Sequence, residues 1–124
     1  MILWVVTFVM TLLGGFVFPW WWPVLVGMVL GLGIRVPYFR WHLAPKEELR
    51  AFILSALGAG LAWGLVAAVQ QGLNHGLLAA KVAVIFHMPN GWSLVFVTAL
   101  VGGLSGGFGI LLGRSCRRNF PGRP

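Results

Sequence analysis

The sequence predicts an all-α integral membrane protein, a four-helix bundle with small-residue helix interfaces and a short interfacial helix between the third and fourth spans. First, 59% of its 124 residues are hydrophobic and only 9% are charged, whereas about 25% of the residues of a soluble domain are charged. Second, the apolar residues fall into four stretches separated by polar or proline-containing segments. We therefore expect one membrane domain over residues 1–124, without a separate soluble domain.

The first two stretches predict a tight helical hairpin, with spans over residues 2–18 and 22–36. The sequence PWWWP at 19–23 ends the first helix and begins the second, since proline interrupts a helix but is tolerated in its first turn. Tryptophan favours the headgroup region, so we expect Trp20, Trp21 and Trp22 to anchor the hairpin there. Both arms are short, and a re-entrant hairpin that never crosses the bilayer is the alternative. Gly27 and Gly31 form a GxxxG pair, which is typical of close helix packing.

Residues 37–50 form the main polar loop, and a third span is predicted over residues 51–69. Pro45, Glu47 and Glu48 suit the first turn of this helix, where the helix dipole favours negative charge. Within the span, Trp63 is interpreted as a packing anchor. Small residues repeat every four positions and predict a helix-packing stripe at Ala56, Gly60, Gly64 and Ala68.

Residues 70–92 are interpreted as an outer loop that contains a short interfacial helix near residues 77–86. It holds the polar residues of one possible site, namely Gln70, Asn74, His75, Lys81 and His87. Two histidines without a carboxylate or a cysteine make a poor metal site, so no metal is expected. Lys81 is expected to reach a lipid phosphate, or alternatively to attract an anion at the mouth of a pore.

The last span is predicted over residues 93–113, within the uncharged and glycine-rich stretch LVFVTALVGGLSGGFGILLG. So many glycines would destabilise a helix in water, but in a bilayer they allow close helix approach. The small residues of one face are Thr98, Gly102, Ser105, Gly109 and Gly113, and bulky apolar residues lie on another. Trp92 is expected at the headgroup level before this span. The basic tail 114–124 follows, and Arg114, Arg117 and Arg118 are expected to anchor to anionic lipid.

The distribution of charge predicts the orientation. Four spans put residues 35–50 and the tail on the same side of the membrane, and these two segments hold eight of the nine Lys and Arg residues. The positive-inside rule makes that side cytoplasmic, so both termini are expected there. Basic loops of this kind are an orientation signal, and no nucleic-acid partner is expected.

The segments AAKVAVIF and VTALVGGLSGGFGILLG, together with PWWWP at 19–23, resemble a set of small bacterial four-helix integral membrane proteins. The resemblance implies four spans and a location in the bacterial cytoplasmic membrane. It implies no activity.

The sequence offers little chemistry. Its only two carboxylates, Glu47 and Glu48, are adjacent and therefore do not face each other on a helix. We find no nucleophile–base pair, phosphate loop or zinc motif, and we expect no catalytic residue and no cofactor. The leading hypothesis is a structural or accessory subunit that assembles with itself or with other membrane subunits in the lipid bilayer. The alternative is a homo-oligomeric passive channel or small transporter, with the glycine-rich last helix lining the path.

Overall fold

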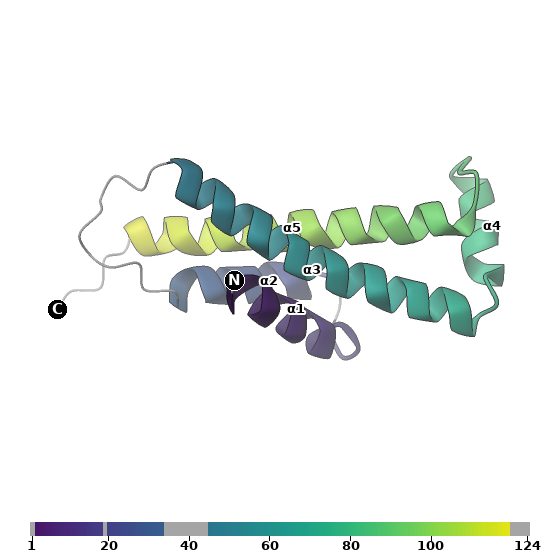
Figure 1. Ribbon diagram of the computed structural model, residues 1–124, viewed down its shortest axis with the longest axis horizontal. Coiled ribbons are helices and arrows are strands. Elements are labelled where there is room, and N and C mark those ends of the chain that lie inside the picture. The colour runs from purple at the N-terminus through teal and green to yellow at the C-terminus, as the bar shows by residue number, and fades with distance from the viewer. Residues whose placement is uncertain (1, 19, 34–44, 120–124) are drawn as a thin grey trace.

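The computed structural model describes residues 2–18, 20–33 and 45–119, and all regular structure in these residues is helical. Two long helices, α3 (Pro45–Leu73) and α5 (Gly91–Asn119), lie antiparallel along the length of the molecule. Two shorter helices, α1 (Ile2–Gly15) and α2 (Trp22–Gly33), pack against them (Figure 1). The short helix α4 (Leu77–Ile85) lies across the far end of the long pair. The predicted all-α class is therefore confirmed, with two long apolar helices packed against two shorter ones.

The long helices follow from long apolar runs with few charges. Both α3 and α5 are long and apolar enough to cross a membrane, and at about 1.5 Å per residue each reaches roughly 44 Å. Their outward side chains are large and apolar, such as Leu57, Leu61, Phe96 and Phe108, and these are exposed. A chain in water buries such side chains where it can, so this surface is suited to contact with lipid or with another protein.

The hairpin of α1 and α2 covers only one half of the long pair. Figure 1 shows it beside the C-terminal half of α5, while the rest of α3 and α5 continues alone as a two-helix arm to α4. The helices have 14 and 12 residues, so each extends only about 20 Å. The hydrocarbon core of a bilayer is about 30 Å thick, and neither helix matches it.

The position of the hairpin turn along α5 follows from the contacts of α2. This helix runs parallel to α5, because Gly27 lies against Gly106 and Ile110 while Gly31 lies against Ile110 and Arg114. Trp22 precedes Gly27 by five residues, or about 7.5 Å. The turn therefore lies beside the middle of the apolar stretch of α5.

Helix bounds differ from the expected spans for local reasons. The first helix ends at Gly15 instead of residue 18, because Gly14 and Gly15 weaken it and the amides of Val17 and Phe18 both turn back to the carbonyl of Gly14. Of the expected span 22–36, residues 34–36 lie outside the described part. The third helix begins at Pro45 and reaches Leu73, so it takes in residues assigned to both neighbouring loops.

The last helix is longer than the expected span 93–113 at both ends. Asn90 caps its start, since its side-chain oxygen accepts hydrogen bonds from the amide and the hydroxyl of Ser93, each at 3.0 Å. At the other end the helix continues to Asn119 through residues that were assigned to a basic tail. Arginine is a good helix former and is favoured near a helix C-terminus, which explains this extension.

Candidate functional site

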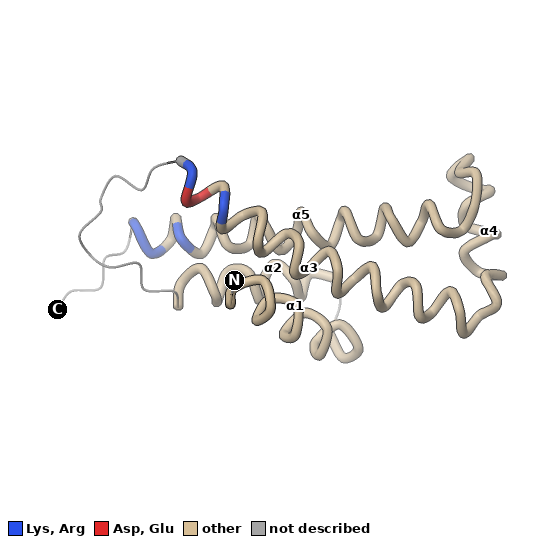
Figure 2. The backbone as a smooth tube through the Cα atoms, viewed as in Figure 1, with Lys and Arg blue, Asp and Glu red and all other residues tan. Residues whose placement is uncertain are grey.

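The charged residues of the long helices gather at one end of the molecule (Figure 2). Lys46, Glu47, Glu48 and Arg50 come from the first turns of α3, while Arg114, Arg117 and Arg118 come from the last turns of α5. The antiparallel packing of these two helices brings the two groups together. We name this region, defined by these seven residues, the charged end.

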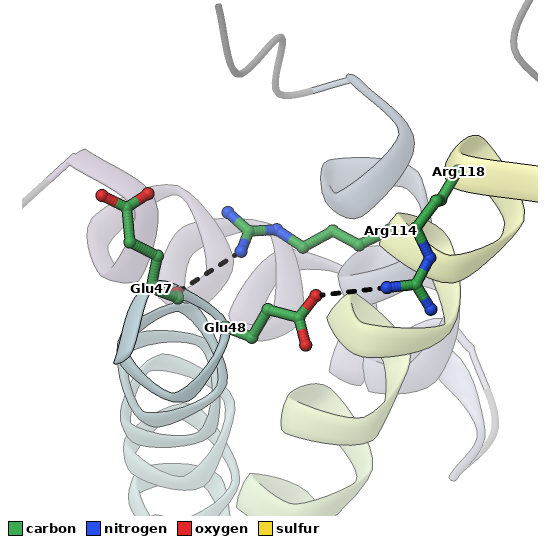
Figure 3. Close-up of polar contacts among 4 residues, drawn as sticks. All are labelled: Glu47, Glu48, Arg114 and Arg118. Carbon is green, nitrogen blue, oxygen red and sulfur yellow. Dashed lines mark hydrogen bonds and ion pairs between the residues drawn. The ribbon is translucent and has the colours of Figure 1, made fainter. Parts of the chain in front are cut away.

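The three arginines of α5 connect it to the ends of its neighbours. Arg114 Nη1 donates to the backbone carbonyl of Glu47 at 3.4 Å, and Arg118 Nη1 lies 3.8 Å from Glu48 Oε1 (Figure 3). Arg117 Nη1 donates to the carbonyl of Leu32 at 3.2 Å, one residue before the end of α2. A cation at this position satisfies a carbonyl that the helix leaves unpaired.

These contacts add to the interpretation of the three arginines as lipid anchors. Each of them binds within the chain, and the side chain of Arg118 is still 66% exposed. An exposed ion pair of this length contributes at most about 1 kcal/mol. The three arginines therefore connect the end of α5 to the ends of α2 and α3.

Further along the two long helices, away from the charged end, the backbones of α3 and α5 approach each other closely. A Cβ atom added at Gly60 would lie 2.8 Å from the carbonyl oxygen of Ala99, and one added at Gly103 would lie 2.9 Å from that of Ala56. Gly64 faces the methyl group of Ala99, and the ring of Trp63 covers Gly102. Thus Ala56, Gly60 and Gly64 of the expected stripe meet α5, while Ala68 is half-buried.

A second close approach joins α2 to the other side of α5. A Cβ at Gly27 would lie 2.5 Å from the carbonyl oxygen of Gly106, and one at Gly31 would lie 2.5 Å from that of Ile110. In return, Gly109 and Gly113 lie against the carbonyl oxygens of Val24 and Met28. Gly109 and Gly113 therefore contact α2, whereas Gly102 contacts α3. The expected single small face of the last helix is two adjoining faces with different partners.

The hydroxyl of Ser105 bonds within α5. This residue is half-buried, and its hydroxyl donates to the carbonyl of Val101 in the preceding turn at 2.8 Å. A serine at helical spacing from glycines has no need to face a partner when it can bond back to its own helix.

Several contact residues were not singled out from the sequence. Ser55 is buried and donates its hydroxyl to the carbonyl of Gly106 at 3.0 Å, between α3 and α5. Ala59 also lies against Gly106, and Gly58 packs against α1 at Trp4 and Thr7. The sequence does contain a signal for these contacts, because small residues lie on two adjacent faces of the third helix. The four-residue repeat at 56, 60, 64 and 68 describes only one of those faces.

The tryptophans of the hairpin turn have different surroundings. Trp22 Nε1 donates to the carbonyl of Met10 at 3.0 Å, and its ring stacks on Phe18 with centroids 4.2 Å apart. Trp22 thus fastens the turn, while Trp20 and Trp21 are exposed. Trp92, in the first turn of α5, is also exposed.

The polar residues expected on the outer side lie around α4 without forming one cluster. His75 and His87 both adopt left-handed backbone conformations, with φ of 50° and 54°, where α3 and α4 end. Asn74 and Lys81 share a shallow hollow with Leu77 and Leu78, and Gln70 is exposed. No group of three or more potential metal ligands occurs among the described residues. Two of these polar residues, Asn74 and Lys81, share the hollow, and the backbone amide of Asn74 donates to the carbonyl of Gln70 at 3.0 Å.

Comparison of the chain with protein-family models, with curated proteins and with solved structures finds no match. Its resemblance to small bacterial four-helix membrane proteins remains an expectation. Any functional conclusion has to rest on the geometry described above.

Proposed function

We propose that this chain is a non-catalytic structural or accessory protein of a membrane, in which α3 and α5 cross the bilayer. The supporting observation is how the polar side chains are used. Ser55, Arg114 and Arg117 all donate to main-chain carbonyls of another helix. Such contacts between a side chain and the backbone of a neighbouring helix hold helices in place, as expected of a structural role.

The proposed span is supported by the length and surface of the two long helices. The uncharged residues 51–73 of α3 and 93–113 of α5 lie side by side, and each run is long enough for the hydrocarbon core. The charged end then lies in the cytoplasmic headgroup region by the positive-inside rule, and α4 lies at the opposite surface. A bacterial cytoplasmic membrane remains the proposed location.

The hairpin is proposed to enter the membrane from the charged side and to turn near the middle of the membrane, which replaces the headgroup position expected for Trp20, Trp21 and Trp22. This is the re-entrant alternative to four full spans, and the half-length cover of α3 and α5 favours it. Polar backbone at mid-depth has to be satisfied within the protein, and in the turn the amides of Val17 and Phe18 both bond to the carbonyl of Gly14. The hairpin returns to its own side, so the orientation proposed for the long helices is unchanged.

Assembly with further copies or other subunits is proposed because the arm beyond the hairpin has only two helices. The channel alternative is less favoured by the geometry. Its lining was to be the glycine face of the last helix, yet Gly106 lies under Ala59 of α3 and Gly109 lies under Val24 of α2. Within one chain this face is already occupied.

The topology is tested by cysteine labelling of intact vesicles with a membrane-impermeant maleimide. The background is Cys116→Ser, which removes the single cysteine. We expect Lys46→Cys and Asn74→Cys to label from opposite sides, and Trp20→Cys to label from neither side until detergent is added. Labelling of Trp20→Cys from the same side as Asn74→Cys would instead support four full spans. Labelling of all three positions from one side would refute a membrane-spanning pair.

The proposed assembly is tested by native mass spectrometry of protein gently extracted from its own membrane. Whole multiples of 13.5 kDa, or additional polypeptide masses, would support a homo-oligomer or an accessory subunit. A 13.5 kDa species that carries only lipid would contradict the subunit proposal.

A further inference from the structure

We propose that the outward face of the first half of α3 binds an anionic phospholipid, with the headgroup phosphate held by Lys46 and Arg50. This site rests on the proposal that α3 crosses a bilayer. It differs from the contacts of Arg114, Arg117 and Arg118, which face the neighbouring helices.

The positions of the two cations carry the first step. Lys46 and Arg50 lie four residues apart, so they occupy the same side of α3, and both are exposed. Like charges at this spacing repel each other and destabilise a helix, whereas an anion bound between them removes the repulsion. Two carboxylates are close in sequence to these cations. Glu48 is paired with Arg118 of α5, and Glu47 is exposed.

The apolar residues that follow on the same side carry the second step. Ile53, Leu57 and Leu61 continue the spacing of Lys46 and Arg50 at intervals of three, four and four residues. Their exposed fractions are 46%, 54% and 54%, so the helices that the structure describes leave about half of each side chain uncovered. This face of α3 therefore has two cations at its start, followed by an apolar stripe. If α3 crosses a bilayer, the stripe runs in the direction of the lipid acyl chains.

This arrangement complements one ligand class. A phosphate diester at the membrane surface supplies the negative charge, and its acyl chains supply the apolar contact. Basic groups between a membrane helix and the cytoplasmic surface attract anionic lipid in this way. A soluble phosphate would use the cations alone and would leave the apolar stripe unused.

The test measures lipid binding to the full chain in dodecyl maltoside micelles by native mass spectrometry. Phosphatidylglycerol is titrated, and phosphatidylcholine of the same chain length is the comparison. We expect adducts with phosphatidylglycerol at concentrations where phosphatidylcholine gives few. Equal binding of the two lipids would overturn the proposal.

Variants locate the site. We expect K46Q/R50Q to bind phosphatidylglycerol about 30-fold more weakly, equivalent to about 2 kcal/mol at about 1 kcal/mol per cation near an anionic surface. R118Q removes one charge from the same end but from another face, and K81Q removes one from α4. We expect both to bind within about twofold of the parent, on the same reasoning of local rather than general charge.

Other outcomes are equally informative. Unchanged affinity in K46Q/R50Q, or an equal loss in R118Q, would overturn the assignment of the site. Displacement of the lipid by glycerol 3-phosphate at equal concentration would show that phosphate alone is recognised, and would also overturn it. If the parent chain binds no phosphatidylglycerol but shows the expected cysteine labelling, this site alone is refuted, whereas labelling of all positions from one side would refute the membrane proposal beneath it.

Discussion

Replacement of Gly27 by alanine tests whether the backbone contact between α2 and α5 stabilises the protein. The added Cβ would lie 2.5 Å from the carbonyl oxygen of Gly106 and 2.8 Å from the amide nitrogen of Ile110. Both are main-chain atoms of a helix, so neither can move aside by itself. The two helices have to separate, by about 0.9 Å if the closest contact is to reach an ordinary 3.4 Å.

The cost of this separation follows from the distance dependence of packing. A gap of about 0.5–1 Å loses a quarter to a half of the dispersion energy of each contact. Overpacking of this kind costs about 1–3 kcal/mol, while alanine offsets up to about 1 kcal/mol through its better helix propensity. We expect Gly27→Ala to lower the free energy of unfolding by about 1–2 kcal/mol.

The assay is equilibrium unfolding in mixed micelles with increasing sodium dodecyl sulfate, followed by tryptophan fluorescence. The matched control is Gly33→Ala in the same helix, where an added Cβ meets nothing within 4 Å. We expect the control to be as stable as the parent, or more stable. Equal stability of Gly27→Ala and Gly33→Ala would refute the reasoning.

A double variant sharpens the test. An added Cβ at Gly31 would lie 2.5 Å from the carbonyl oxygen of Ile110, so it demands the same movement of α2 away from α5. Once one substitution has separated the helices, the other should cost less. We therefore expect Gly27→Ala/Gly31→Ala to be destabilised by less than the sum of the single variants, and strict additivity would show that the two contacts relax independently.

Two further predictions use the same unfolding assay. Ser55→Ala removes the buried bond to the carbonyl of Gly106 and should cost about 0.6 kcal/mol, the average for hydrogen bonds between membrane helices, and a change above about 2 kcal/mol would show that the hydroxyl does more than this. Glu48→Gln weakens only an exposed pair with Arg118, at 3.8 Å, so stability should fall by less than about 1 kcal/mol. A larger loss would mean that this ion pair is stronger than its geometry indicates.

The sequence predicted the helices better than their partners. Glycines at helical spacing indicated that close approach would occur, but the last helix has glycines on two adjoining sides. Gly102 and Gly103 meet α3, whereas Gly109 and Gly113 meet α2. Spacing alone places residues on a face of one helix, and it contains no information on which other helix lies there.

The charged residues show the same limit. Their sequence positions indicated that the polar loop and the tail share one side of a membrane. The tail continues as helix to Asn119, and its arginines bond to residues far away in the chain, Leu32 and Glu47. Such pairings depend on helices that are brought together by packing, and local sequence does not encode them.

The sequence by itself determined the helical class, the positions of the apolar helices and the gathering of positive charge, because these depend on composition and on local periodicity. Only the tertiary structure decided that the first hairpin covers half of the long pair and turns near its middle. The contacts of Gly27 with Gly106 and of Gly31 with Ile110 fix that depth. The position of one helix along another is set by close contact between backbones, which a single stretch of sequence cannot specify.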